Sequence, residues 1–230
     1  MTKTLLIVGF GPGVSSAVAL KFGADGFSVA LVARNSERLA AGVADLKARG
    51  VPAAAFVADA ADPDSLRGAI RKARTELGPI SVLHWNAFSG GEAGDLLAIE
   101  PAAVGRVFDV AVVGLLAAVE ETLPDLKSAG DGAVLVTNGA YGEPAPMMDA
   151  FAVRTQAMGV AVANAAKAKL VGLLSARLRN DGIYVGEVTI AGAIKGTPTD
   201  TGAGAIEGAA VAEAFWSLYE ARNATRARVG

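Results

Sequence analysis

Three glycines near the start of the chain have the spacing of a phosphate-binding turn. Residues 9–15 read Gly-Phe-Gly-Pro-Gly-Val-Ser and lie between an apolar run and a helical pattern. Glycine lets the backbone turn tightly and approach a pyrophosphate, and the next helix offers free N–H groups to the anion. A tight turn without a ligand is the alternative, but the strand-turn-helix context favours a dinucleotide. The turn residues predicted to bind it are Gly9, Gly11, Gly13 and Val14.

An arginine follows the second apolar run, where the choice between two nicotinamide cofactors is made. NAD sites usually place an acidic residue there to bind the ribose 2′-hydroxyl. This chain instead has Arg34 followed by Asn35. A guanidinium can bind a 2′-phosphate through two parallel hydrogen bonds, and a carboxylate would repel it. We therefore expect NADP(H) as the cofactor, held by Arg34 and Asn35; a solvated loop charge is the alternative role of Arg34.

The elements that must position these residues alternate between strand and helix from one end to the other. This alternation is typical of a doubly wound parallel α/β sheet with helices on both faces. The predicted strands are 4–9, 28–33, 53–58, 80–86, 133–137 and 184–190, with a short seventh at 226–229. The predicted helices are 14–25, 36–49 with a cap at Ser36, 63–77, 101–127 with a bend near Gly114, 157–178 and 205–221.

No repeat, charged tail or linker interrupts this pattern. We therefore predict a single Rossmann-type domain of six to seven strands over residues 1–230. The stretch from Gly139 to Phe151, rich in Pro, Met and Gly, is the only long one without a regular pattern, and it is a candidate lip of a substrate site.

Composition excludes several classes of function. The chain has no cysteine and one histidine, which excludes disulfides and argues against a metal site. The formal net charge of −2 argues against a nucleic-acid surface. Hydrophobic residues make up 52% of the chain, yet no uninterrupted apolar run approaches the roughly 20 residues of a membrane helix. We expect a soluble cytoplasmic protein that acts on a small molecule.

Three further motifs follow the third, fourth and sixth predicted strands. They are Asp59-Ala60-Ala61-Asp62, Trp85-Asn86-Ala87-Phe88 and Ile190-Ala191-Gly192-Ala193-Ile194. Together with the glycine turn they resemble the short-chain dehydrogenase/reductase family over nearly the whole chain.

The resemblance implies roles for these motifs around the cofactor. Asp59 and Ala60 would contact the adenine, and Asn86 and Ala87 match half of the family's Asn-Asn-Ala-Gly segment. Gly192 and Ile194 would border the nicotinamide carboxamide. Phe88 replaces the glycine of the family segment and would crowd the adenosine ribose. Loop capping is the alternative role for Asp59 and Asn86.

The family's reaction uses a tyrosine, a lysine, a serine and an asparagine, and the resemblance places all four positions here. Lys167 matches the lysine, which would bind the nicotinamide ribose. Ala163 stands at the tyrosine position, Gly139 or Asn138 at the serine position and Ala111 at the asparagine position. No Tyr-x-x-x-Lys pair occurs anywhere in the chain. The usual proton donor is therefore missing.

Hydride transfer to a carbonyl builds negative charge on oxygen, which must be protonated or stabilised. A positioned general acid contributes about 10²–10⁴-fold in rate. Lys167 and Tyr141, the nearest phenol, are the predicted catalytic residues. Asp149, Glu143 and Arg154 are weaker candidates, because charged loop residues usually only fix the loop. His84 lies on a central strand, where a hydrogen-bonded core histidine is expected.

Three functions stay open at this point. The leading one is an NADP(H)-dependent oxidoreductase that acts on a small carbonyl or alcohol with a non-standard proton donor. The second is a non-redox enzyme, such as a cyclase, lyase or isomerase, that reuses the pocket. The third is an inactive subunit that senses the nucleotide. Relatives usually pair through the helices after strands four and five, which predicts a homodimer or homotetramer.

Overall fold

A seven-stranded parallel sheet organises the molecule, as the sequence predicts. The computed structural model describes residues 3–89, 93–197, 200, 202 and 205–230. Within them the strand order is β3-β2-β1-β4-β5-β6-β7. The strands are β1 (Thr4–Val8), β2 (Ser28–Ala33), β3 (Ala53–Val57), β4 (Ile80–Trp85), β5 (Ala133–Gly139), β6 (Tyr184–Ile190) and β7 (Arg226–Val229). The bounds of β2, β6 and β7 are those expected from their apolar patterns.

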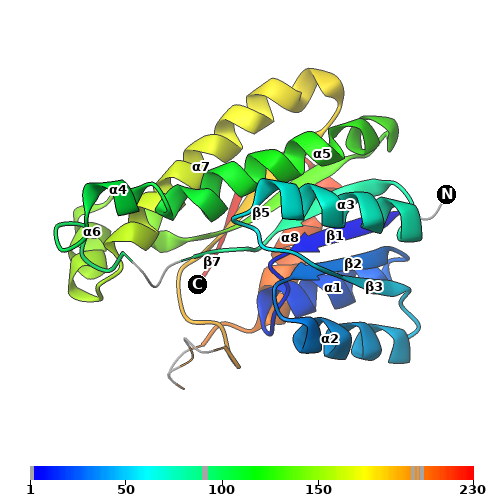
Figure 1. Ribbon diagram of the computed structural model, residues 1–230, viewed down its shortest axis with the longest axis horizontal. Coiled ribbons are helices and arrows are strands. Elements are labelled where there is room, and N and C mark those ends of the chain that lie inside the picture. Colours follow the sequence, from blue (N-terminus) through cyan, green and yellow to red (C-terminus); the bar gives the residue numbers. More distant parts are fainter. Residues whose placement is uncertain (1–2, 90–92, 198–199, 201, 203–204) are drawn as a thin grey trace.

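Helices cover both faces of the sheet (Figure 1). One face carries α1 (Val14–Ala24), α2 (Ser36–Ala48) and α8 (Gly208–Ala221). The other carries α3 (Pro63–Leu77), α5 (Leu115–Ser128) and α7 (Met158–Leu178). The strands β1 to β6 contribute side chains to two separate apolar cores, one on each face, and the edge strand β7 contributes to one of them. The doubly wound three-layer architecture expected from the sequence is therefore confirmed.

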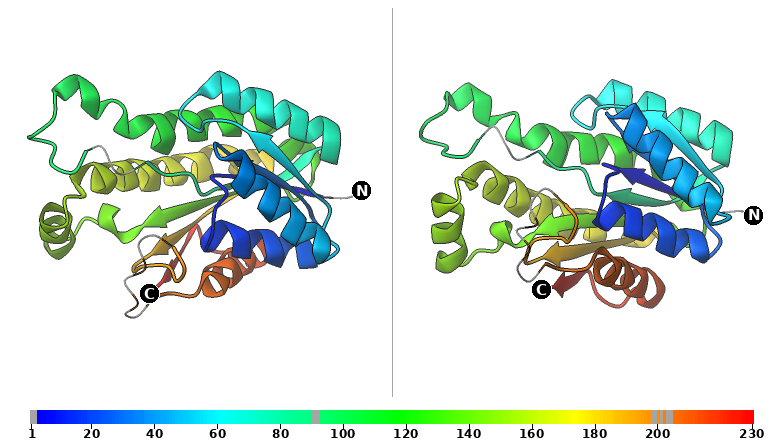
Figure 2. Two further views of the ribbon diagram at one scale, coloured as in Figure 1. Left: turned by 60° about the horizontal axis from the view of Figure 1, so that its bottom comes forward. Right: turned by 90° about the horizontal axis from the view of Figure 1, so that it is seen from below.

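The strand order reverses between β1 and β4, since β1 pairs with β2 on one side and with β4 on the other. Sheets of this kind bind ligands outside the carboxyl ends of their strands at such a reversal. The glycine turn follows the end of β1 at this point. Asn86 follows the end of the neighbouring strand β4. Figure 2 shows the segment after β6 passing below the same edge of the sheet. The fold thus gathers the predicted nucleotide motifs at one edge.

Two segments extend beyond this edge and differ from the prediction. The expected helix 101–127 is divided into α4 (Pro101–Val104), a π-helix η1 (Asp109–Gly114) and α5. The π-helix passes into α5 at Gly114 with helical backbone angles, and an added Cβ on Gly114 would lie 2.0 Å from the carbonyl oxygen of Ala60. The stretch expected to be irregular from Gly139 to Phe151 contains a 3₁₀ turn η2 (Ala140–Gly142) and α6 (Pro146–Arg154), which Pro146 initiates at its first position.

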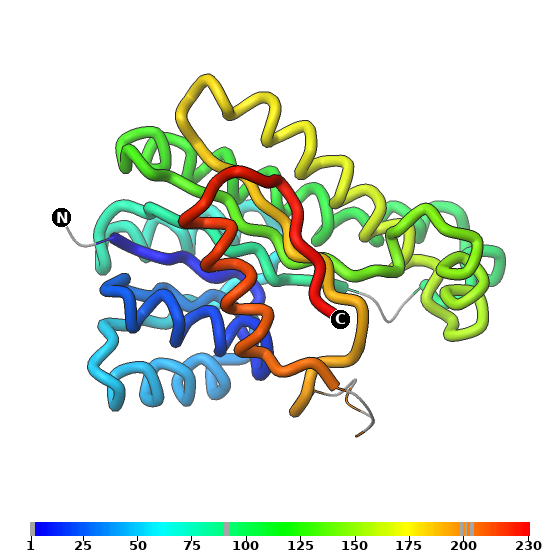
Figure 3. Tube along the Cα trace, turned by 180° about the vertical axis from the view of Figure 1, so that it is seen from behind, coloured from blue at the N-terminus to red at the C-terminus, as the bar shows by residue number. Residues whose placement is uncertain are grey.

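Backbone hydrogen bonds join the loop after β4 to the start of α7. The N–H groups of Met158 and Gly159 donate to the carbonyls of Gly94 and Ala93, at 3.0 and 2.8 Å. Figure 3 shows, from behind, α6 and the start of α7 beside the chain that follows β4. We call α6, the start of α7 and the chain that follows β4 the lobe. The lobe borders the region above β4 and β5, where the sequence predicts an irregular loop.

Two long helical stretches, Pro101–Ser128 and Met158–Asp181, are apolar enough on average to cross a membrane. The search for uninterrupted apolar runs did not reveal them, because scattered charged residues interrupt each stretch. Both pack on the sheet through α5 and α7, and core helices of soluble proteins pass the same test. They are weak support for a membrane location, and the cytoplasmic location stays a prediction.

Candidate functional site

The glycine turn and the end of β4 are in direct contact. Gly9 has a φ of +89°, and an added Cβ there would lie 2.4 Å from the backbone nitrogen of Ala87. The Asn86 side-chain amide donates to the carbonyl of Gly9 at 3.0 Å. Only glycine permits this approach, so Gly9, Asn86 and Ala87 lie together as the motifs predict. Phe88 is exposed.

The start of α1 is free of side-chain caps. Ser15 bonds the backbone of Gly11 in both directions, since its hydroxyl accepts from the N–H and donates to the carbonyl, each at 2.9 Å. Gly13 is the N-cap of α1, makes no side-chain hydrogen bond and precedes a first turn without acidic residues. The backbone N–H groups of the first turn of α1, which starts at Val14, are therefore not capped by a side chain at Gly13 and can donate to a bound anion.

The segment after β6 closes against this turn. Gly13 has a φ of +87°, and an added Cβ would lie 2.9 Å from Cγ2 of Ile194. Gly192 packs against Ile206 in the same segment, where an added Cβ would approach to 3.0 Å. Two predicted cofactor residues that are far apart in sequence, Gly13 and Ile194, thus meet.

The predicted 2′-phosphate residues lie at the start of α2. Asn35, rather than Ser36, caps this helix by accepting the N–H of Arg38 at 2.7 Å. Arg34 is exposed and has no hydrogen bond or ion pair to any described residue. The expected serine cap is wrong because the asparagine amide one position earlier accepts from the N–H of the third helical residue.

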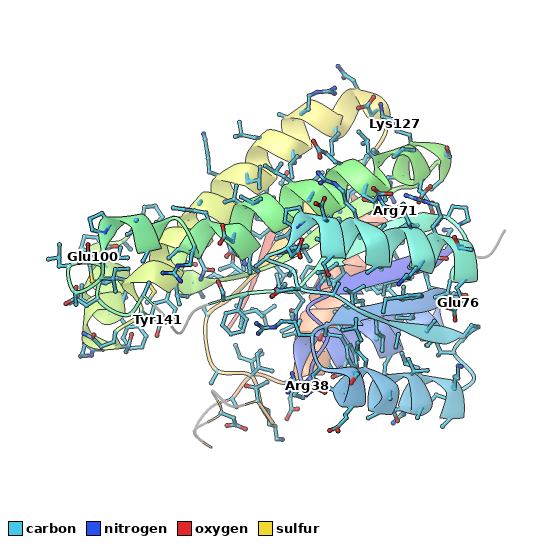
Figure 4. The ribbon with its side chains drawn as sticks, viewed as in Figure 1. Arg38, Arg71, Glu76, Glu100, Lys127 and Tyr141 are labelled. Carbon is cyan, nitrogen blue, oxygen red and sulfur yellow. The ribbon has the colours of Figure 1, made fainter. Side chains whose placement is uncertain are left out.

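Sequence reasoning missed a second arginine at this place. Arg38 extends over the glycine turn, with its Nη1 3.8 Å from the position of a Cβ on Gly11 (Figure 4). It too lacks a partner among the described residues. A cation in the first turn of a helix opposes the helix dipole. This unfavourable position, four residues after Arg34, is the signal that could have identified it.

The aspartate motif after β3 is a self-bonded turn. Asp59 Oδ1 accepts the N–H of Ala61 at 2.9 Å, and the Asp59 N–H donates to Ser65. The carbonyl of Ala60 lies against Gly114, the last residue of η1. Asp62 caps α3. The turn-forming role of Asp59 is therefore present, and the adenine contact of Asp59 and Ala60 stays a prediction.

Lys167 is the buried cation of the site. It lies on α7, is only 3% exposed and has no hydrogen bond or ion pair to any described residue. Burial lowers its pKa from 10.5 to about 8, and the charge of Glu187 opposes that shift. Proton transfer is most efficient for a group with a pKa near the working pH. A lysine with such a pKa exchanges its proton near neutral pH, and the catalytic role of Lys167 stays a prediction.

Tyr141 lies to one side of Lys167. Its hydroxyl is 3.1 Å from Thr155 Oγ1, and its ring stacks on Phe151 at 5.4 Å between centroids. Figure 4 shows it in the lobe near α6. In this conformation its hydroxyl does not bond Lys167, so its role as proton donor stays a prediction.

The two alanines that replace the tyrosine and the asparagine lie in one apolar cluster. Ala163 and Ala111 are buried with Ala93 and Val107, and Leu96, Ile99 and Val112 pack around them. Such side chains cannot donate or relay a proton. The absence of a proton donor at the predicted tyrosine and asparagine positions stays a prediction, since it depends on the alignment of these two alanines with the family.

His84 behaves as expected for a core histidine. It is fully buried, and its Nε2 is hydrogen-bonded to Thr137 Oγ1 at 3.1 Å. Burial lowers its pKa from 6.5 to about 3. The ring stays neutral at physiological pH and takes no part in the site.

Polar side chains between β5, β6 and α7 form a cluster that sequence reasoning identified only in part. Asn138 is buried at the end of β5 and donates to the carbonyl of Asn164 on α7 at 3.0 Å. Glu187 is buried on β6, 2% exposed, and Thr189 donates to its Oε1 at 3.0 Å. A glutamate inside the apolar run of β6 is the signal that was available.

The family model for short chain dehydrogenases matches residues 3–199, most of the chain. The chain belongs to the short chain dehydrogenase family. Membership was expected from the ordered motifs, while the assignment of Ala163 and Ala111 to the tyrosine and asparagine positions stays a prediction.

Curated relatives match part of the chain. A 3-oxoacyl-[acyl-carrier-protein] reductase of Staphylococcus aureus (strain Mu50 / ATCC 700699) is 29% identical over 150 residues, 63% of this chain and 60% of that protein. A cyclohexanol dehydrogenase of Acinetobacter sp. (strain SE19) is 29% identical over 140 residues, 61% of this chain and 56% of that protein. The chain thus matches about 60% of the length of these relatives.

Solved structures share the whole fold. An L-sorbose reductase from Gluconobacter frateurii, complexed with NADPH and L-sorbose, has a TM-score of 0.84 at 20% identity and covers 99% of this chain and 95% of its own. A metagenomic short-chain oxidoreductase in complex with NADP has a TM-score of 0.81 at 20% identity, with 99% and 96% covered. At this identity the likeness establishes the fold.

Proposed function

We propose that the protein is an NADP(H)-dependent oxidoreductase that acts on a small carbonyl or alcohol with a non-standard proton donor. The observation that carries the proposal is a lysine at the family position, buried on α7, with a pKa near 8. Titratable groups with strongly shifted pKa values occur preferentially at functional sites. Family membership and solved relatives with bound NADP or NADPH support the cofactor.

The residues of the nucleotide edge fit such a cofactor. Gly9 and Gly13 have positive φ, the start of α1 has no side-chain cap, and Arg34 and Arg38 have no partners among the described residues. When bound, NADP(H) supplies or accepts the hydride. Arg34 and Arg38 would hold its 2′-phosphate, and the uncapped start of α1 would hold its pyrophosphate.

The proton then comes from this chain. In carbonyl reduction the electron pair of the C=O bond passes to oxygen as carbon receives the hydride. An N–H bond of the Lys167 ammonium breaks and an O–H bond forms, which leaves a neutral amine. Tyr141 is the alternative donor, and movement of its side chain away from Thr155 would be required. In alcohol oxidation the neutral amine accepts the proton.

A fluorescence titration with NADPH tests the cofactor. We expect Arg34→Ala and Arg38→Ala each to weaken NADPH binding about ten- to hundredfold, the loss of a charge-assisted contact. NADH binding should stay unchanged, since NADH lacks the phosphate. Arg49→Ala, at the other end of α2 in an exposed pair with Asp45, is the matched control. Equal losses for NADH and NADPH would contradict the assignment.

The outcomes also separate the other two functions. NADPH binding without turnover of any carbonyl or alcohol in a panel supports a subunit that senses the nucleotide. Failure to bind at millimolar NADPH supports a non-redox enzyme with a reused pocket. The apolar cluster around Ala163 supports testing both alternatives, because its side chains cannot donate or relay a proton.

A homodimer or homotetramer is the proposed assembly. Apolar side chains are exposed on η1 and α5 after β4 and on α7 after β5, namely Val113, Leu116, Val162 and Leu173. Exposed apolar patches on helices often mark contacts between subunits. Light scattering should show a dimer or larger, and Leu173→Glu should shift it toward monomer. A monomer at all concentrations would exclude this assembly.

A further inference from the structure

A buried carboxylate faces the same helix as Lys167. Successive residues of a strand point to opposite faces, and Val185 of β6 lies in the core that also holds Val171 of α7. Glu187, two residues on, therefore points to the α7 side. It is 2% exposed, and its Oε2 has no hydrogen-bond partner. A buried carboxylate oxygen without a partner is costly unless a positive charge compensates it.

One guanidinium connects this carboxylate to the backbone beside Lys167. Arg226 of β7 donates through Nη2 to the carbonyl of Ala168 at 2.7 Å, and its Nε lies 3.8 Å from Glu187 Oε1. The same guanidinium thus lies beside Glu187 and beside the residue that follows Lys167 on α7. Arg226 is 55% exposed, so it compensates the carboxylate only in part.

Other charged groups around α7 do not serve Lys167. Asp181 pairs with Lys127 and Arg177, Glu143 pairs with Arg228, and Arg154 lies over the ring of Phe151. Asp109 is partly exposed on η1, and Lys169 is exposed on α7. Glu187 is the one charged group with a marked electrostatic effect on the lysine.

We propose that Glu187 is the counter-ion of Lys167 and that the two side chains form one acid–base pair, which replaces the hydroxyl groups missing from this site. The inference rests on the proposed function, because it assigns the source of the proton. Glu187 is a positioning residue that acts through the lysine. Its negative charge keeps Lys167 protonated in a dry environment until the substrate oxygen takes the proton. The neutral amine then recovers a proton from water.

The test is an NMR titration of the protein with ¹³C-labelled lysine side chains, in which Lys167→Met identifies the Lys167 signal. We expect Glu187→Gln to lower the pKa of Lys167 by about one unit, the usual effect of losing a nearby opposite charge. Arg226→Gln removes a competing cation and should raise it. Glu213→Gln, on α8 at the other face of the sheet, is the matched control and should leave it unchanged.

A second measurement connects the pair to the reaction. The pH at which carbonyl reduction declines should move with the pKa of Lys167, downward in Glu187→Gln and upward in Arg226→Gln. Glu187→Asp, which keeps the charge, should restore most of the wild-type profile.

The two measurements separate the two proposals. If no carbonyl is reduced by the wild type, the proposed function fails while the NMR titration still decides on the pair. A folded Glu187→Gln protein in which Lys167 titrates as in the wild type would overturn the inference. If Glu187→Gln does not fold, the same titration of Glu187→Met decides, and an unchanged pKa of Lys167 in that variant would overturn the inference.

Discussion

Lys3 and Lys167 show how the surroundings of a lysine decide its pKa and its role. Lys3 precedes β1, and its ammonium bonds Asp131, which also accepts from the Tyr219 hydroxyl at 2.9 Å. Arg222 donates to the backbone carbonyl of Asp131. Lys167 lies on α7, which packs on β6, and is buried without a direct partner among the described residues.

The pKa values of the two lysines move in opposite directions. The hydrogen bond to Asp131 raises the pKa of Lys3, while burial lowers that of Lys167 to about 8. A paired and half-exposed lysine holds its proton firmly, so it can only stabilise the fold. A buried lysine with a distant counter-ion can release and regain its proton near neutral pH. The comparison therefore favours a structural role for Lys3 and a chemical role for Lys167.

The largest expected effect is on catalysis. Lys167→Met should lower the rate constant of carbonyl reduction by about 10²-fold or more, the contribution of a positioned general acid. Lys3→Met and Lys169→Met should leave it within a few-fold. Steady-state kinetics with NADPH measures this, and a Lys167→Met enzyme as fast as the wild type would end the assignment of Lys167 as the donor.

The buried pair should contribute function at the expense of stability. Lys167→Met/Glu187→Met removes both buried charges, and we expect its free energy of unfolding to be unchanged or higher by about 1–4 kcal/mol. Glu187→Met alone leaves the lysine without its counter-ion and should be less stable than the double variant. Urea unfolding compares them. A double variant much less stable than the wild type would show that the pair holds the fold.

The pH dependence of the reaction should follow Lys167. The ammonium donates in reduction, so the rate should fall about tenfold per pH unit above a pH of about 8. Alcohol oxidation uses the neutral amine and should rise through the same pH. Lys3→Met should leave both profiles unchanged. Profiles that are flat from pH 6 to 10 would contradict a lysine donor.

The smallest effects concern the stability of the Lys3 region. Exposed ion pairs contribute less than about 1 kcal/mol, so Lys3→Met should cost at most that amount. The raised pKa of Lys3 means that its contribution is complete below its ordinary pKa of 10.5 and is lost as pH rises through the folded value. Lys167 has the opposite sign, since its lowered pKa makes the fold more stable as pH rises from about 8 to 10.5. Urea titrations at pH 7 and 10 distinguish the two.

Local sequence patterns predicted the regular elements well and the irregular ones poorly. The bounds of β2, β6 and α3 follow directly from apolar runs and from Pro63 at the first helical position. The π-helix η1 was not foreseen, because it depends on the contact between Gly114 and the carbonyl of Ala60, which lie far apart in the chain. Helix α6 was missed because its short sequence, Pro146–Arg154, has a weak apolar period and is supported by contacts with α7.

The sequence by itself determined the family and the doubly wound parallel architecture, because the order of the motifs and the hydrophobic period can be read along the chain. It also predicts which functional positions hold alanine or glycine. The tertiary structure alone decided that Glu187 faces the helix of Lys167 and that Arg38 lies over the glycine turn. It also decided that Ala111 and Ala163 share one apolar cluster. Burial and electrostatic effects come from residues distant in sequence, so the pKa of Lys167 and its counter-ion could not be derived from any local pattern.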